Sequence, residues 1–196
     1  MRRGQPRRDF QVAARAVAAT ALRDPLLVEV GCGSGYYSEV LPLLMGGPLR
    51  YIGVDYASGM MALATELYPE VPFLLGDASA LPLDGESCDI LLSGTSLMHV
   101  VDYQQAIAES VRVARHWCIF HTVPVMARRS TTLLRKQAYG APVVEVIFNQ
   151  AELERLFTSN GLDIQATYDS IPYDVSDVIG EPSWTLTYLC RKRHHP

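Results

Sequence analysis

The chain lacks any long hydrophobic run. No apolar stretch approaches the roughly 18 residues that a membrane-spanning helix needs, so no membrane association is predicted. The basic N-terminal residues 1–4 are not followed by the apolar core of a signal peptide. We therefore expect a cytoplasmic protein.

The chain also has fewer positively charged than negatively charged residues. The 17 Lys and Arg residues are outnumbered by 21 Asp and Glu residues, and Lys136 and Lys192 are the two lysines of the chain. General nucleic-acid binders concentrate an excess of cations on one face. With a net charge of −4, this chain is not expected to bind nucleic acid.

Cysteines are few and scattered. The four are Cys32, Cys88, Cys118 and Cys190. They form no C-x-x-C pair, and no histidine cluster accompanies them. We expect reduced, buried thiols and no metal site.

What the chain does have is an alternation of short apolar runs with segments of helical periodicity. Hydrophobic residues make up 48% of the 196 residues and charged residues 19%, which suits a single globular domain over residues 1–196. The alternation is typical of a mostly parallel sheet with helices on both faces. Strands are predicted over 26–30, 51–55, 72–75, 88–92, 117–123, 162–168 and 184–191. Helices are predicted over about 10–23, 36–45, 58–67, 102–114 and 149–161. Polar and apolar residues alternate over 183–189, which predicts an edge strand or one covered on one face.

The most informative segment is Glu29-Val30-Gly31-Cys32-Gly33-Ser34-Gly35. It joins an apolar strand to a helix through a glycine-rich turn, the arrangement by which open α/β sheets bind nucleotide-like cofactors. The dinucleotide fingerprint G-x-G-x-x-G would need a glycine where this chain has Tyr36. The pattern is instead E-x-G-x-G-x-G.

That pattern resembles the first motif of class I S-adenosylmethionine-dependent methyltransferases. The triplet Gly76-Asp77-Ala78 is similar to a later motif of that family, and Leu81-Pro82-Leu83 followed by Ser87-Cys88-Asp89 resembles its type-11 subgroup. The resemblance implies an α/β fold with a doubly wound, mostly parallel seven-stranded sheet, helices on both faces and an antiparallel last strand. It also implies S-adenosylmethionine as the cofactor.

The resemblance further implies a set of cofactor-binding residues. Glu29 accepts a hydrogen bond from the amino group of the cofactor, Asp55 from the ribose hydroxyls and Asp77 from the adenine amino group. The other predicted contacts are Gly31, Cys32, Gly33, Gly35, Tyr56, Met60, Gly76, Ala78, Ser93 and Gly94. Alternatives stand beside these roles: a tight turn without a ligand for the glycines, a helix N-cap for Asp55 and plain helix packing for Met60.

Two histidines are candidate general bases, because an unperturbed imidazole titrates near pH 6.5. His99 follows the fourth predicted strand, where a positional role beside the cofactor pocket is favoured over proton transfer. His121 lies within the fifth strand and would have to face the mouth of the pocket.

The acceptor side is less well defined. The chain has neither an [N/D/S]-P-P-[Y/F] motif nor a Pro-Cys pair, which disfavours methylation of adenine or glutamine nitrogen and of cytosine C5. We therefore expect a small-molecule acceptor.

Two segments are candidates for covering the substrate. Residues 124–148 form a connection that is longer than usual and are a candidate substrate-covering segment. Residues 1–25 are a candidate N-terminal helix or lid. Residues 124–148 carry Arg128, Arg129, Arg135, Lys136 and Tyr139. A solvated helix face is slightly favoured for these residues over contact with the acceptor.

Three other functions compete with small-molecule methyl transfer. The first is a non-catalytic protein of the methyltransferase fold that binds a cofactor or a partner. The second is a methyltransferase acting on RNA or protein, and the third is a nicotinamide oxidoreductase, which the glycine spacing disfavours. The oligomeric state stays open.

Overall fold

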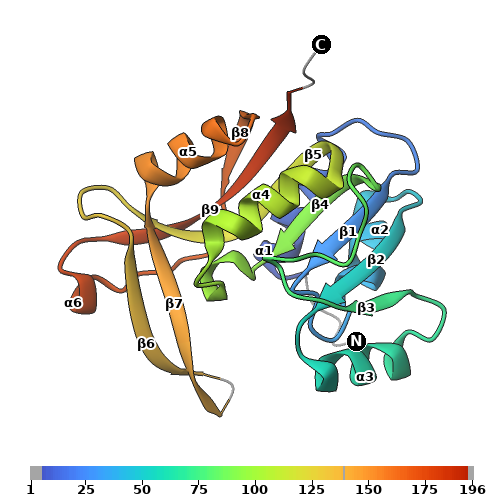
Figure 1. The fold of residues 1–196 in the computed structure, drawn as a ribbon, viewed down its shortest axis with the longest axis horizontal. Coiled ribbons are helices and arrows are strands. Elements are labelled where there is room, and N and C mark those ends of the chain that lie inside the picture. The colour runs from blue at the N-terminus through green and yellow to red at the C-terminus, as the bar shows by residue number, and fades with distance from the viewer. Residues whose placement is uncertain (1–5, 139, 194–196) are drawn as a thin grey trace.

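The computed structural model describes residues 6–138 and 140–193; residues 1–5, Tyr139 and residues 194–196 lie outside the description. Within the described ranges the chain forms a nine-stranded sheet flanked by helices (Figure 1). The strands are β1 Leu26–Val30, β2 Arg50–Asp55, β3 Phe73–Leu75, β4 Cys88–Gly94, β5 Ala114–Met126, β6 Thr132–Ala138, β7 Ala141–Asn149, β8 Leu162–Asp169 and β9 Ser183–Lys192. The helices are α1 Arg8–Ala18, α2 Tyr37–Met45, α3 Ser58–Leu67, the 3₁₀ helix η1 Leu97–His99, α4 Tyr103–Val113, α5 Gln150–Ser159 and α6 Ser176–Ile179.

The centre of the sheet is parallel. Strands follow the order β3-β2-β1-β4-β5, each parallel to its neighbour. Apolar side chains on one face pack with α4 and α5, and those on the other face pack with α1 and α2. The predicted α/β class and the placement of helices on both faces are confirmed.

The last strand is antiparallel, as predicted, but it is not an edge. Strand β9 lies between β5 and β8 and runs antiparallel to both. The polar residues of its alternating pattern are buried, and their hydroxyls are satisfied: Thr185 Oγ1 donates to the carbonyl of Ile171 at 2.6 Å, and Thr187 Oγ1 lies 2.5 Å from Ser170 Oγ. The outer strand is β8, whose exposure alternates along its length.

The segment 124–148 is not a helix face. Strand β4 ends at Gly94 opposite His121, whereas β5 continues to Met126, and β7 pairs with the free edge of this extension. Strands β6 and β7 form an antiparallel hairpin that projects from the sheet at the lower left of Figure 1. The apolar, β-branched run at 143–148 favours a strand, and its last three residues are fully buried. With these two additional strands, the sheet has nine strands where seven were predicted.

Two cations of the segment 124–148 form ion pairs within the protein. Glu181, 3% exposed, accepts hydrogen bonds from the backbone N–H groups of Arg128 and Arg129 at 3.0 and 2.6 Å. Lys136 Nζ lies 2.5 Å from the buried carboxylate of Glu145. Arg128 Nε also lies 3.3 Å from Glu181 Oε2, so Arg128 and Lys136 have ion-pair partners within the protein itself.

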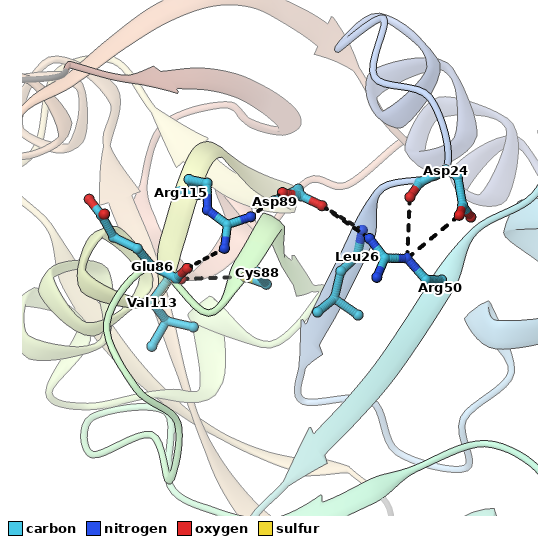
Figure 2. A network of polar contacts seen from close by, with 8 residues as sticks. All are labelled: Asp24, Leu26, Arg50, Glu86, Cys88, Asp89, Val113 and Arg115. Carbon is cyan, nitrogen blue, oxygen red and sulfur yellow. Dashed lines mark hydrogen bonds and ion pairs between the residues drawn. The ribbon is translucent and has the colours of Figure 1, made fainter.

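A network of hydrogen bonds and ion pairs connects the N-terminal ends of the central strands (Figure 2). Asp89 at the start of β4 accepts from the backbone N–H of Leu26 at 2.9 Å and from Arg115 at 2.6 Å. Arg50 at the start of β2 lies 3.7 Å from the same carboxylate. Since these residues stand at the N-terminal ends of parallel strands, the network lies at the end of the sheet opposite the glycine-rich turn. The Ser87-Cys88-Asp89 motif therefore stabilises the sheet.

Helix α1 is shorter than predicted and is part of the core. It ends at Ala18, because Thr20 Oγ1 donates to the carbonyl of Val17 at 2.7 Å and Ala21 takes a left-handed conformation with φ 55°. Ala13 and Ala16 are fully buried. In the described ranges no helix combines the length and the hydropathy needed to cross a membrane.

Candidate functional site

The glycine-rich turn is tied to the end of β2. The N–H groups of Gly31 and Cys32 donate to the carbonyl of Val54 at 2.8 and 3.1 Å. The N–H of Gly33 donates to Asp55 Oδ2 at 2.9 Å. These bonds fix the conformation of the turn next to the carboxylate that was predicted to bind the ribose.

The three glycines of the turn serve different purposes, although all have positive φ. A Cβ on Gly31 would lie 2.2 Å from Ser96 Cβ, and one on Gly35 would lie 2.5 Å from the ring of Phe73. A Cβ on Gly33 would meet no heavy atom within 4 Å. Packing within the protein therefore explains the missing side chains at Gly31 and Gly35, and Gly33 is the position where the turn borders open space.

The Asp55 carboxylate accepts hydrogen bonds from the glycine-rich turn and from the start of α3. The side chain is 8% exposed, and Oδ1 accepts from the N–H of Ala57 at 2.9 Å while Oδ2 binds Gly33. The N-cap alternative is wrong, because the N-cap residue of α3 is Ala57, and Asp55 lies two residues before it. Each carboxylate oxygen has a second lone pair for a ligand hydroxyl. Tyr56 and Met60 follow at 81% and 44% exposure, so their side chains are accessible beside the turn.

The Gly76-Asp77-Ala78 triplet follows β3. Asp77 is exposed, and its Oδ1 accepts from the N–H and the hydroxyl of Ser79 at 2.8 and 2.7 Å. These hydrogen bonds lower the pKa of Asp77, so the side chain is an ionised acceptor near neutral pH. A Cβ on Gly76 would lie 2.6 Å from Pro82 Cδ, which gives this glycine a packing role.

Glu29 is buried beneath the turn, with 1% of its surface exposed. Its Oε2 accepts a hydrogen bond from the hydroxyl of Tyr51. A Cβ on Gly94 would lie 2.0 Å from Oε1, so the end of β4 can pass the carboxylate because it carries a glycine there. Burial raises the pKa of Glu29 well above its usual range, and the hydrogen bond from Tyr51 partly offsets the rise.

Serine residues link the turn to the loop after β4. Ser96 Oγ donates to the carbonyl of Val30 at 2.7 Å and lies 3.0 Å from Ser93 Oγ. The predicted site residue Ser93 is buried, with 4% of its surface exposed. Cys32 is buried as well, and all four cysteines are free thiols.

His99 lies in η1 and connects the loop after β4 with the hairpin. Its Nδ1 is 3.0 Å from the carbonyl oxygen of Val144 in β7, so this nitrogen donates. The ring is half-buried. This contact gives His99 a structural role that holds the hairpin, whereas its predicted place beside the cofactor pocket stays a prediction.

The geometry disfavours His121 as a general base. Its side chain is 1% exposed, and its ring nitrogens lie 2.8 Å from Thr187 Oγ1 and 3.0 Å from Thr122 Oγ1. The ring of Tyr37 packs edge-on against it at 6.0 Å between centroids. Burial lowers the pKa of His121 to about 4, so the imidazole is neutral at physiological pH.

We expect His121 to make the stability of the domain depend on pH. The unfolded chain, with a histidine pKa of 6.5, binds a proton more readily than the folded chain with a pKa of about 4. The contribution of His121 is therefore present above pH 6.5 and is lost as the pH falls towards 4, by at most about 3 kcal/mol. Glu29 has the opposite effect on stability. Because its pKa is raised in the folded state, protonation of Glu29 at lower pH favours the folded state.

Urea unfolding of the wild type and of His121→Gln between pH 4 and 7.5 separates the two contributions. The difference in unfolding free energy between the two proteins should shrink as the pH falls through this window. A pH-independent difference would contradict the buried neutral state of His121.

Sequence reasoning missed two residues of this site. Tyr51 was assigned only to the start of a strand, and Ser96 to a loop. Their partners lie 22 and 66 residues away, and no local motif signals such pairs. Phe10 is a third contact of interest, since its ring packs edge-on against Tyr36 at 5.2 Å and Tyr37 at 5.4 Å.

Comparisons with known proteins agree with this arrangement. Residues 28–120 match a family described as a methyltransferase domain, of type 11. A probable S-adenosylmethionine-dependent methyltransferase of Mycolicibacterium smegmatis is 30% identical over 161 residues, which cover 82% of this chain and 60% of that protein. A ubiquinone/menaquinone biosynthesis C-methyltransferase of Campylobacter jejuni is 31% identical over 103 residues, which cover 50% of this chain and 44% of that protein. The chain thus spans about half the length of these relatives.

Solved structures share the fold. The 1,6-didemethyltoxoflavin-N1-methyltransferase of Burkholderia thailandensis superposes with a TM-score of 0.70 at 17% identity, covering 96% of this chain and 80% of that one. The fold and the glycine-rich turn define a class I S-adenosylmethionine-dependent methyltransferase domain. Within that class, residues 28–120 match the type-11 methyltransferase family. S-adenosylmethionine is the cofactor of this family.

The residues of the turn fit such a cofactor. The open space before Gly33 lets a ligand approach the backbone, and the adjoining Asp55 carboxylate offers acceptor lone pairs to vicinal hydroxyls. The buried carboxylate of Glu29, below the same turn, suits a cationic amino group, whose charge would offset the cost of burial.

Proposed function

We propose that this protein transfers a methyl group from S-adenosylmethionine to a small-molecule acceptor. The observation that carries the proposal is the contrast among the glycines of the turn. Gly31 and Gly35 meet protein atoms, whereas Gly33 opens onto free space beside the carboxylate of Asp55. Packing does not require a glycine at this middle position, where the positive φ is the conformational reason for glycine and the missing side chain leaves room for a ligand.

In this proposal the turn and the strand ends after it hold the cofactor. Asp55 binds the ribose hydroxyls, Asp77 the adenine amino group, and Glu29 the amino group of the methionine part. Further proposed contacts come from Cys32, Tyr56, Met60, Ala78 and Gly94. When bound, the sulfonium supplies an electrophilic methyl group. The protein's own task is to bind, orient and desolvate, and positioning alone accounts for much of the rate of such transfers.

The acceptor is proposed to bind beyond the ends of β4 and β5. Ligands of open α/β sheets occupy the space beyond the C-terminal ends of the strands. The β6–β7 hairpin projects from this end of the sheet and is held there through His99 and Val144. The small-molecule class is supported by the names of similar proteins, one a C-methyltransferase of ubiquinone/menaquinone biosynthesis and the other a 1,6-didemethyltoxoflavin-N1-methyltransferase.

The first experiment measures the binding of S-adenosylhomocysteine by isothermal titration calorimetry. We expect a dissociation constant in the micromolar range, which corresponds to a binding free energy of about −8 kcal/mol. A well-folded protein that releases no heat would refute the cofactor assignment. Methyl transfer from labelled S-adenosylmethionine to a panel of phenols, amines and carboxylic acids then tests the acceptor class.

The same pair of measurements separates the proposal from its competitors. A non-catalytic protein of this fold would bind S-adenosylhomocysteine and methylate none of the small molecules. A macromolecular methyltransferase would transfer label to protein or RNA in a cell extract and not to the small-molecule fraction.

A further inference from the structure

Within the described residues, the side chain that donates a hydrogen bond to Glu29 comes from the neighbouring strand. Tyr51 lies in β2, two residues before Gly53, which pairs with Glu29 in the parallel register. Its hydroxyl reaches Oε2 of Glu29, and the two residues are 7% and 1% exposed. The contact is therefore a buried hydrogen bond between the two central strands that lead into the cofactor site.

The surroundings of Glu29 make this hydrogen bond important. Burial is costly for a carboxylate, and the nearby Asp55 adds repulsion between like charges. Tyr37 and Cys32 lie close enough to interact electrostatically but carry no positive charge. Among the described residues, the side chains that act on the Glu29 carboxyl are Tyr51, which donates a hydrogen bond, and Asp55, which repels it, and neither is a cation.

The hydrogen bond also fixes the direction of the carboxylate. With Oε2 held by Tyr51, Oε1 lies against the backbone of Gly94 at the end of β4, where a Cβ would be only 2.0 Å away. A glutamate side chain has three rotatable bonds, and a strong hydrogen bond at one oxygen reduces its freedom. Tyr51 therefore contacts one oxygen of the carboxylate, and the backbone of Gly94 lies close to the other.

We propose that Tyr51 is a positioning residue that holds Glu29 in place for the amino group of S-adenosylmethionine. The inference rests on the proposed function, and it adds a residue that touches no ligand atom itself. It predicts that the tyrosine hydroxyl affects recognition of the amino-acid part of the cofactor and leaves recognition of the nucleoside part unchanged.

The test compares two ligands on Tyr51→Phe. S-adenosylhomocysteine carries the amino group, and 5′-methylthioadenosine lacks the whole amino-acid part. Calorimetry should show about tenfold weaker binding of S-adenosylhomocysteine, because hydrogen bonds to charged groups are strong, and less than about twofold change for methylthioadenosine. Tyr188→Phe, which removes a hydroxyl from a fully buried tyrosine on the opposite face of the sheet, is the matched control and should bind both ligands as the wild type does.

A double-mutant comparison completes the test. If Tyr51 acts through Glu29, adding Tyr51→Phe to Glu29→Gln should change the affinity for S-adenosylhomocysteine by less than about twofold. Equal losses for both ligands would assign Tyr51 a general structural role and overturn the inference, as would an unchanged affinity for S-adenosylhomocysteine. If the wild type binds methylthioadenosine but not S-adenosylhomocysteine, the inference fails while nucleoside binding stands. If it binds neither, the proposed function itself fails.

Discussion

Asp55→Ala should weaken the binding of S-adenosylhomocysteine by about 100-fold, equivalent to about 2.7 kcal/mol. Two causes combine. The variant loses the carboxylate proposed to accept from the ribose hydroxyls, and it frees the N–H of Gly33, which that carboxylate holds at 2.9 Å. Since the side chain also binds the N–H of Ala57, the unfolding free energy should fall by about 2 kcal/mol.

Asp55→Asn is the matched variant for this prediction. Its amide oxygen can keep one of the two backbone hydrogen bonds, so most of the stability should return while the affinity stays well below that of the wild type. Calorimetry and urea unfolding measured on the same samples give both quantities. If Asp55→Ala bound S-adenosylhomocysteine as tightly as the wild type, the ribose role of Asp55 would be refuted.

Gly31→Ala should be the most damaging single change in the turn. Gly31 has φ 75°, and its new Cβ would lie 2.2 Å from Ser96 Cβ. Left-handed strain of about 1–2 kcal/mol adds to an overpacking cost of about 1–3 kcal/mol, so we expect the unfolding free energy to fall by about 4 kcal/mol. Chemical denaturation measures this loss directly.

Gly33→Ala is the control, because it introduces the same methyl group into open space. With φ 53° and no heavy atom within 4 Å of the Cβ, it should cost only about 1 kcal/mol of stability. Its affinity for S-adenosylhomocysteine should nevertheless drop about tenfold or more, because the methyl group occupies the space that the ligand needs. The opposite ranking, with Gly31→Ala stable and Gly33→Ala unfolded, is incompatible with the assigned roles.

These two pairs of variants address a general feature of the site. Several groups that the sequence presents as ligand contacts are also structural, so we expect some substitutions mainly to destabilise the domain, some mainly to weaken binding, and Asp55→Ala to do both. Gly31 and Gly76 fall in the first class, whereas Gly33 and Tyr56 fall in the second.

Much of the fold followed from local patterns. Apolar runs at 26–30 and 88–92 became β1 and β4, because a continuous apolar run is buried on both faces of a parallel sheet. The hairpin was missed although its second strand has a clear β-branched run at 143–147. The basic residues around that run drew attention to a solvated helix, whereas one of them, Lys136, pairs with Glu145 inside the hairpin.

The sequence by itself determined the cofactor end of this protein: a strand, a turn with glycines at alternate positions, and an acid at the end of the next strand. Such features are local, because φ preferences and hydrophobic period depend on a few neighbouring residues. The tertiary structure decided which glycine faces open space, that His121 is buried among hydroxyls, and that Tyr51 holds Glu29. Those outcomes depend on the register between strands far apart in the sequence, and no local pattern encodes that register.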